Sequence, residues 1–301
     1  MLDKKSILAI VVTYHPDSSF AERFERLTEQ VDAVLIVDNN SGPEAVSMLK
    51  EVASRPNVAL VLNPKNLGTA AALNVGVKSA VAQDYKWVAT FDQDSSILGN
   101  YFEDLLQVYE ACRQNNNIAM MTPVYCEQAL ATECLSSEGA RVRFIPVDKT
   151  MTSGSLVKTD CFRSVGLFDE SLFIDYVDHE FALRLMKAGY KIIRSNTCKL
   201  LHRLGRTTPH CILGMRFYSS EHDSTRRYYI ARNRILVYRK YGTFRPLWIV
   251  KDLVSFLKEI AKITLAEENA AAKLSATVRG IRHGILGRTG SLEPGLNTGK
   301  T

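Results

Sequence analysis

The sequence predicts an α/β protein in which helices flank a mostly parallel central sheet, with a helical C-terminal extension. Up to residue 124, short apolar runs rich in β-branched residues alternate with longer amphipathic segments, as in βαβ units around a buried parallel sheet. After residue 225 the pattern changes to long stretches of helical periodicity. The 301 residues can bury a core without a disulfide or metal.

The individual elements follow from the apolar runs and the turn residues between them. Pro43 suits the first turn of a helix, and Gly189 suits a position just after a helix end. Strands are expected at Ile7–Thr13, Ala33–Val37, Val58–Leu62, Trp87–Phe91, Ile118–Val124 and Lys191–Ser195. Helices are expected at Phe20–Gln30, Pro43–Ser54, Leu67–Ala82, Asn100–Gln114 and Phe181–Ala188, and two or three more after Thr225. The segment after Arg288, rich in Gly, Thr and Pro, is expected to be disordered.

Charge is distributed unevenly along the chain. Residues 1–181 carry 15 Lys and Arg against 25 Asp and Glu, whereas residues 182–301 carry 23 against 7. The net charges of −10 and +16 indicate that the basic part has an anionic partner such as phosphate, anionic lipid or nucleic acid. Nucleic acid is disfavoured because no helix-turn-helix, zinc-finger or RNP motif accompanies the basic residues.

The chain ends and the cysteines exclude other classes. The apolar run Ile7–Val12 has no small-residue cleavage site after it, so it fits a strand better than a signal peptide. No stretch approaches the roughly 18–20 apolar residues of a spanning helix. The six cysteines form no C-x-x-C pair and are expected to be reduced thiols of a cytosolic protein.

Polar residues follow three of the predicted strands. Thr13 and Tyr14 end the first strand, Asp38 ends the second, and Asp92 and Asp94 follow the fourth. Ligands of open parallel sheets bind outside the carboxyl ends of the strands, although Asp and Asn also simply terminate strands and cap helices. The carboxylates of Asp92 and Asp94, one residue apart after a buried strand, indicate a divalent cation, Mg²⁺ or Mn²⁺, shared with a diphosphate.

Three further positions are candidates for binding or chemistry. Asn66 and Gly68 precede an alanine-rich helix, whose N-terminus is either an anion site or an ordinary cap. His202, after the last predicted strand, is either structural or a further metal ligand. Asp178 lies with Asp175 and Glu180 before a predicted helix, where acids either stabilise the helix dipole or act as a general base.

The C-terminal helices have two interpretations. One basic and aromatic segment, 226–242, presents either a solvated face or cations that close over a diphosphate. Trp248–Leu265 is amphipathic with interrupting lysines, which suits either a packed helix or one lying on a membrane surface.

Taken together, the motifs VVTYHPD, VDNNS, NLGTAAALNVGV, FDQDS, SGSLV, GLFDESLFIDYVDHEFALRL, HRLG and YYIARN resemble, in order and spacing, glycosyltransferase family 2. The likeness covers roughly residues 6–290 and extends to its bacterial rhamnosyltransferase branch. It implies the GT-A fold, a Rossmann-like sheet, with residues 1–224 as the nucleotide-sugar-binding and catalytic domain. Residues 225–301 would then be an amphipathic helical region with a flexible tail.

The resemblance also implies roles for single residues. Thr13, Tyr14, Asp38, Asn66, Gly68 and Asp92 would bind the nucleotide sugar. Asp94, Asp92 and His202 would hold the metal ion. Asp178 would be the catalytic base. In the family's acidic pair the residue before the base is also acidic, but here it is Val177, and Asp175 and Glu180 are the candidates to substitute for it.

The expected activity is inverting transfer of L-rhamnose from dTDP-L-rhamnose to a saccharide hydroxyl, with a cytoplasmic enzyme in peripheral contact with an anionic membrane. The acceptor would be a lipid-diphosphate-linked glycan of the bacterial surface, such as O-antigen. A family 2 transferase that uses a UDP-sugar and a non-catalytic nucleotide-sugar-binding module are the alternatives. A dinucleotide oxidoreductase is disfavoured because no G-x-G-x-x-G follows the first strand.

Overall fold

The computed structural model describes residues 6–112, 117–127, 144–202, 207–212 and 215–292, which form two compact units. The first unit comprises Met1–Asp169 and Phe181–Arg203, and the second comprises Glu170–Glu180 and Leu204–Thr301. In this division, Glu170–Glu180 and the chain from Leu204 onward group with the C-terminal helices, and the expectation of functional domains at 1–224 and 225–301 stays a prediction.

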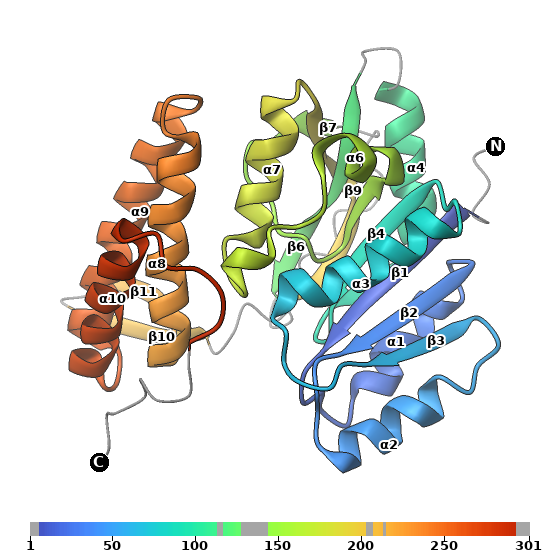
Figure 1. Ribbon diagram of the computed structural model, residues 1–301, viewed down its shortest axis with the longest axis horizontal. Coiled ribbons are helices and arrows are strands. Elements are labelled where there is room, and N and C mark those ends of the chain that lie inside the picture. The colour runs from blue at the N-terminus through green and yellow to red at the C-terminus, as the bar shows by residue number, and fades with distance from the viewer. Residues whose placement is uncertain (1–5, 113–116, 128–143, 203–206, 213–214, 293–301) are drawn as a thin grey trace. The chain divides into compact units, whose positions relative to one another are not determined.

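The first unit is built on one mixed sheet (Figure 1). Its strands are β1 (Ile7–Thr13), β2 (Ala33–Asp38), β3 (Val58–Leu62), β4 (Trp87–Asp92), β5 (Ser96–Ile97), β6 (Ile118–Glu127), β7 (Phe144–Pro146), β8 (Ser155–Lys158) and β9 (Lys191–His202). They are ordered β3-β2-β1-β4-β8-β6-β9-β5, with β7 paired to β9. The neighbours β3, β2, β1 and β4 are parallel, as predicted, whereas β8 is antiparallel to both β4 and β6.

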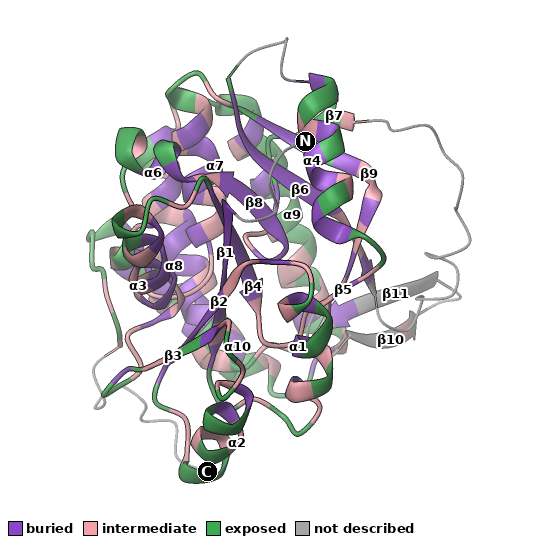
Figure 2. Cartoon of the chain, turned by 90° about the vertical axis from the view of Figure 1, so that its right-hand side faces the viewer, coloured by how far each residue is buried: buried purple, intermediate pink, exposed green. Residues whose placement is uncertain are grey.

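The sheet forms because its central strands are continuous apolar runs that helices cover. Burial follows the strands β1, β4, β6 and β8 in Figure 2, while the outer faces of the helices are exposed. Helix α3 packs on β1, where a Cβ at Gly76 would lie 2.6 Å from side-chain atoms of Ile10, so only glycine fits this approach. The helices of the first unit are α1 (Phe20–Thr28), α2 (Pro43–Val52), α3 (Thr69–Ala82), α4 (Tyr101–Cys112) and α6 (Thr159–Val165). Helix α7 (Val177–Lys187) begins in the second unit and continues in the first, and the 3₁₀ turn η4 (Glu170–Leu172) belongs to the second.

Two element bounds differ from prediction in ways that matter for the site. Strand β9 continues past Ser195 to His202, and Leu201 pairs with Ser96 of β5. His202 is therefore the last residue of a strand and does not lie beyond it. Helix α7 begins at Val177, four residues before the predicted start, so Asp178 lies within its first turn.

In the second unit, the described residues form helices α8 (Ser224–Tyr241), α9 (Pro246–Ala266) and α10 (Ala270–Ile285) and the hairpin of β10 (Thr207–Ile212) with β11 (Met215–Ser220). Helix α10 packs closely on α8 because Gly280 and Gly284 have no side chains: a Cβ there would lie 2.4 Å from the carbonyl oxygen of Tyr228 and 2.7 Å from that of Arg232, respectively. Contrary to the expected disorder after Arg288, Gly290 donates its backbone N–H to Ser171. Residues 293–301 lie outside the described part.

Among the described helices, none combines the length and the apolarity needed to cross a bilayer. Cys112, Cys161 and Cys198 carry free, buried thiols. Cys126 is disulfide-bonded, so the expectation of a fully reduced chain is wrong for this residue.

Candidate active site

The ends of β1 and β2 are joined by a buried polar cluster. Thr13 aligns with Asp38 in the parallel register, and its hydroxyl donates to Asp38 Oδ1 at 2.8 Å. The hydroxyl of Ser41 donates to the same oxygen at 2.5 Å, and its backbone N–H donates to Oδ2 at 2.8 Å. Thr13 and Asp38 are both fully buried. The Asp38 carboxylate therefore already accepts three hydrogen bonds that shape the loop after β2.

Tyr14 is the exposed member of the same edge, with 47% of its surface accessible. Its backbone forms two hydrogen bonds with the side chain of Gln93, which lies between Asp92 and Asp94. The Tyr14 N–H donates to Oε1 at 2.7 Å, and Gln93 Nε2 donates to the Tyr14 carbonyl at 3.1 Å. The residue in the middle of the Asp-x-Asp sequence thus ties the end of β4 to the end of β1.

The loop before α3 is organised by three asparagines. Buried Asn39 donates to the carbonyl of Gly68 at 3.1 Å and accepts from Asn63 Nδ2 at 2.9 Å. Asn66 Oδ1 accepts the N–H of Gly68 at 2.9 Å. Gly68 adopts φ = 86° at the N-cap of α3, a conformation that favours glycine. The predicted residues Asn66 and Gly68 lie at a helix N-terminus, and the amide of Asn66 is engaged in forming the turn.

Asp92, Asp94 and His202 come together at the ends of β4 and β9. One ligand atom from each lies within 4.8 Å of the other two. The Asp94 side chain is 32% exposed and that of His202 is 10% exposed, and His202 Nδ1 lies 3.4 Å from Asp94 Oδ1. Two carboxylates with an imidazole form a donor set that fits a divalent ion such as Mn²⁺. The sequence-predicted metal ligands are therefore adjacent in space.

Three residues that support this group had no assigned role in the sequence. Ser95 Oγ lies 2.8 Å from His202 Nδ1 and 2.7 Å from Ser153 Oγ, which also accepts the N–H of Asp92 at 3.0 Å. Arg23 donates through Nε and Nη2 to the carbonyl of Gln93 at 3.3 and 3.1 Å. Ser95 and Ser153 belong to the motifs FDQDS and SGSLV, which could have identified them. Arg23 has no such signal, because its partner lies 70 residues away.

Asp178 belongs to the second unit, in the first turn of α7. Its side chain is 22% exposed, and Oδ1 accepts the backbone N–H of His179 at 2.8 Å. A partly exposed carboxylate with one hydrogen bond retains acceptor positions for a substrate hydroxyl. This carboxylate can therefore accept a proton.

The other acids around Asp178 have different environments. Val177 is buried, so no polar group replaces the missing acid at that position. Buried Glu180 accepts hydrogen bonds at 2.7 Å from Lys240 Nζ and from the hydroxyl of Tyr241, which makes it part of the packing of the second unit. Asp175 pairs with Arg226 at 3.2 Å. Burial raises the pKa of the Asp175 carboxyl, although the Arg226 guanidinium opposes this shift.

The cations of α8 mostly have internal partners, which corrects the interpretation that they face a diphosphate or a solvated surface. Arg227 pairs with Glu267 at 2.7 Å and also with Glu259, and Arg234 pairs with Asp252 at 2.9 Å. These partners lie at least 18 residues further along the chain. The side chains of Arg227 and Arg234 are only 2% and 6% exposed. Arg227 and Arg234 are therefore paired with acids inside the helical unit and do not contribute to a basic surface.

A mixed α/β sheet whose parallel strands lead to an Asp-x-Asp sequence, with a histidine beside it, suits an enzyme that binds a nucleotide sugar. The chain belongs to glycosyl transferase family 2, whose family model matches residues 8–172. The dTDP-rhamnosyl transferase RfbF of Shigella flexneri is 27% identical over 95% of this chain and 97% of its own length. The galactofuranosyltransferase GlfT1 of Mycolicibacterium smegmatis is 24% identical over 78% of this chain and 83% of its own length.

Solved structures share the fold at low sequence identity. The mannosyltransferase PcManGT of Pyrobaculum calidifontis, in complex with GDP-Man and Mn²⁺, has a TM-score of 0.58 and 14% identity over 95% of this chain and 88% of its own. GalNAc-T7 with UDP, GalNAc and Mn²⁺ has a TM-score of 0.59 and 10% identity over 94% of this chain, which spans 56% of that chain. The GT-A fold inferred from the sequence is thereby confirmed.

Proposed function

We propose that the protein is an inverting glycosyltransferase that moves L-rhamnose from dTDP-L-rhamnose to a hydroxyl of a lipid-linked saccharide in bacterial surface polysaccharide synthesis. The observation that carries the proposal is the Asp92–Asp94–His202 group at the end of β4, in a chain similar over 95% of its length to a dTDP-rhamnosyl transferase. The family assignment supports the reaction class. The donor sugar rests on the similarity alone.

The donor would bind along the edge where β1, β2 and β4 end. Tyr14 would contact the base through its accessible ring, and the buried residues Thr13 and Asp38 would bind the nucleotide by shaping the loop beside it. Asn66 and Gly68 would lie against the nucleotide at the N-terminus of α3, and Asp92 would contact the ribose. A divalent ion, Mg²⁺ or Mn²⁺, held by Asp94, Asp92 and His202 would supply positive charge against the diphosphate.

Asp178 would act as the general base. Its carboxylate would take the proton of the acceptor hydroxyl as that oxygen attacks the anomeric carbon from the face opposite the diphosphate. The bond between the anomeric carbon and the diphosphate oxygen breaks in the same step, so the configuration inverts. Proton removal in such a transition state contributes about 10²–10⁴-fold to the rate.

A panel of nucleotide sugars tests the donor assignment. In the presence of Mn²⁺, we expect dTDP-L-rhamnose to bind and to be slowly hydrolysed in preference to UDP-galactose, UDP-galactofuranose and UDP-N-acetylglucosamine. Binding is measured by calorimetry, and hydrolysis by release of the nucleoside diphosphate with and without Mn²⁺. Preference for a UDP-sugar would favour the alternative that the similarity to GlfT1 supports. Binding without any turnover would favour a non-catalytic module.

We also propose that the outer face of α9 docks on the anionic inner surface of the cell membrane, which would place a cytoplasmic enzyme next to a lipid-linked acceptor. This face exposes Leu247 (75%), Leu257 (61%) and Leu265 (66%), and Val250, Leu253 and Val254 are exposed with them. Both acids within α9 point inward, because Asp252 and Glu259 pair with arginines of α8. The outward charges include Lys251 and Lys258, so the face is apolar and cationic.

Vesicle binding tests this docking face. We expect binding to phosphatidylglycerol vesicles, weak binding to phosphatidylcholine vesicles, and a loss of about tenfold in affinity for Leu257→Glu, since burying one leucine contributes about 1.5–3 kcal/mol. Leu62→Glu, at an exposed leucine of β3, is the matched control and should bind like the wild type. Partition that does not change at high salt would contradict electrostatic docking. A concentration-dependent dimer that Leu257→Glu dissociates would show that the face binds a second copy.

A further inference from the structure

The segment Ser171–Tyr176, which leads into α7, has an unusual backbone. Phe173, Asp175 and Tyr176 adopt φ values of 67°, 62° and 64°. Non-glycine residues rarely occupy this left-handed region, and for bulky aromatic residues it is strained. Such a conformation persists only where surrounding contacts determine it. The backbone N–H of Glu180 then donates to the carbonyl of Tyr176 at 2.9 Å, so the segment continues directly into the turn that carries Asp178.

Asn233 of α8 binds the main chain of this segment at three points. Its Nδ2 donates to the carbonyl oxygens of Leu172, Ile174 and Asp175 at 2.8, 2.7 and 2.9 Å. The side chain is fully buried, and its Oδ1 accepts from Arg232 Nε at 2.9 Å. One amide thus gathers three carbonyls of a segment whose residues lie 58 to 61 positions away in sequence.

Arg232 extends the contact to the C-terminal tail. Its guanidinium, buried against the rings of Tyr228 and Tyr229, donates to the carbonyl of Leu172 at 2.9 Å and to that of Gly290 at 2.5 Å. Gly290 in turn donates its N–H to the carbonyl of Ser171 at 2.7 Å. The segment is therefore held between α8 and the residues that follow α10.

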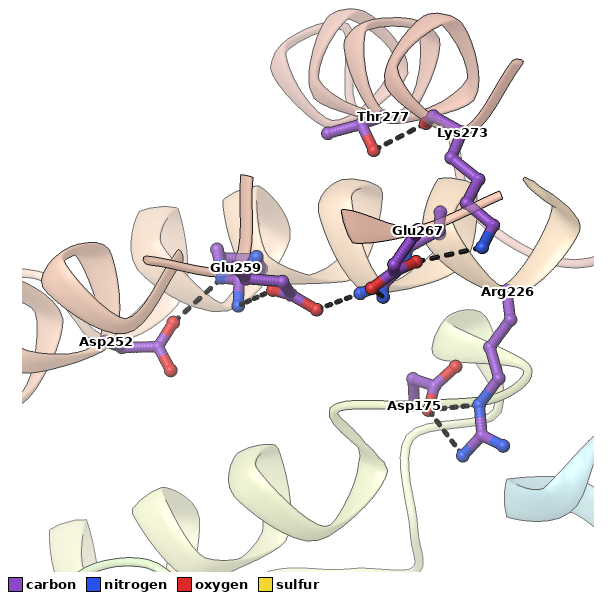
Figure 3. A network of polar contacts seen from close by, with 9 residues as sticks. Asp175, Arg226, Asp252, Glu259, Glu267, Lys273 and Thr277 are labelled. Carbon is purple, nitrogen blue, oxygen red and sulfur yellow. Dashed lines mark hydrogen bonds and ion pairs between the residues drawn. The ribbon is translucent and has the colours of Figure 1, made fainter. Parts of the chain in front are cut away.

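Side chains of the segment are fixed as well. Figure 3 shows Asp175 paired with Arg226 beside the network that joins Asp252, Glu259, Glu267 and Lys273. Tyr176 donates its hydroxyl to Asp252 at 2.7 Å, and Asp252 is itself bound to Arg234. Asn233 and Arg232 differ from these partners because they bind the main chain directly and set its path whatever the side chains are.

We propose that Asn233 and Arg232 are positioning residues that hold Ser171–Tyr176, with its three left-handed residues, in place and thereby orient the Asp178 carboxylate. The inference rests on the proposed role of Asp178 as the base. Without the three hydrogen bonds to Asn233, the segment relaxes toward ordinary backbone angles and the first turn of α7 rotates. A displacement of about 1 Å at a reacting group costs up to about 10²-fold in rate.

The isosteric variant Asn233→Asp tests the proposal because it removes the N–H donors and keeps the oxygen that binds Arg232. We expect kcat for transfer to fall by about 10–100-fold, with the KM for the donor and the affinity for the free nucleotide unchanged. Amide hydrogen exchange in residues 171–176 should become faster. Arg239→Ala is the matched control: Arg239 also lies on α8 and donates to main-chain carbonyls, but those of Gly284 and Ile285.

A kcat of Asn233→Asp equal to that of Arg239→Ala would overturn the proposal, and so would faster exchange without loss of kcat. The second variant is Arg232→Lys. It keeps the positive charge but cannot donate to the carbonyls of Leu172 and Gly290 at the same time, as a guanidinium does, and it should lower kcat in the same way. Unfolding of both variants would show that the pair serves only the core of the helical unit. Failure of the proposed function can be distinguished from failure of this proposal. In that case the wild type would show no transfer, while amide hydrogen exchange would still report on the segment.

Discussion

Asp178→Asn is expected to lower the rate of glycosyl transfer by about 10²–10⁴-fold and to leave nucleotide binding unchanged. Asparagine has the same shape and can still accept the N–H of His179, which now bonds Asp178 Oδ1 at 2.8 Å. An amide cannot take the proton of the acceptor hydroxyl. The residues proposed to bind the nucleotide all lie in the first unit, whereas Asp178 belongs to the second. Rates at saturating donor and acceptor, with calorimetry of nucleotide binding, separate the two effects.

Two neighbouring acids give matched controls for this variant. Glu180→Gln should alter stability more than chemistry, because Glu180 is buried against Lys240 and Tyr241. Asp175→Asn should retain most of its activity, since Asp175 is paired with Arg226. If Asp175→Asn lost more activity than Asp178→Asn, the base would be misassigned. Near-wild-type turnover of Asp178→Asn would exclude it from proton transfer.

Local patterns predicted the first half of the sheet well. The runs at β1, β2 and β4 are apolar and end in polar residues, so both the strands and the edge where Thr13, Asp38 and Asp92 lie could be inferred from adjacent residues. The parallel register then places Thr13 beside Asp38 without further information. In this region the local sequence of each strand is enough to predict where the strand lies and where it ends.

The course of β9 could not be inferred in the same way. Its polar stretch Ser195–Thr197 resembles a strand end, and Ser195 Oγ does accept the local N–H groups of Thr197 and Cys198. The strand continues past this stretch because the pairing of β6 with β9 shifts register between Thr122 and Val124, and the two strands remain paired on either side of the shift. His202 reaches the aspartates through this long-range pairing, so its role could be suggested by a motif but not by periodicity.

The helical unit shows the largest departure from sequence reasoning. The arginines of α8 look like a basic surface because their acidic partners, Asp252, Glu259 and Glu267, lie far along the chain. Arg232 and Asn233 end the motif YYIARN, but the motif alone gave neither residue a role, and asparagine is a poor residue for the middle of a helix. The contacts of Asn233 can be identified only in the folded structure, where it binds the main chain of Ser171–Tyr176.

The second large effect is expected at the cation group. Asp94→Ala should weaken binding of Mn²⁺ alone by more than about tenfold and lower transfer by about 10²–10³-fold, the range seen when one group that stabilises developing charge is removed. Asp94 offers a partly exposed carboxylate at the end of β4, with its Oδ1 3.4 Å from His202 Nδ1. Mn²⁺ affinity is measured by calorimetry without donor, which does not depend on turnover.

His202→Ala should have the smaller effect of the two, because an imidazole adds one neutral donor whereas Asp94 adds a charge that balances the cation. Asp84→Asn is the control: this exposed carboxylate pairs with Arg163 and lies outside the cluster, so both Mn²⁺ affinity and transfer should stay at wild-type values. Unchanged Mn²⁺ affinity in both site variants would contradict the assignment. Transfer could also survive complete removal of divalent ions by a chelator. In that case His202, Ser95 and the two aspartates would serve to order the end of β4, and other groups would neutralise the leaving diphosphate.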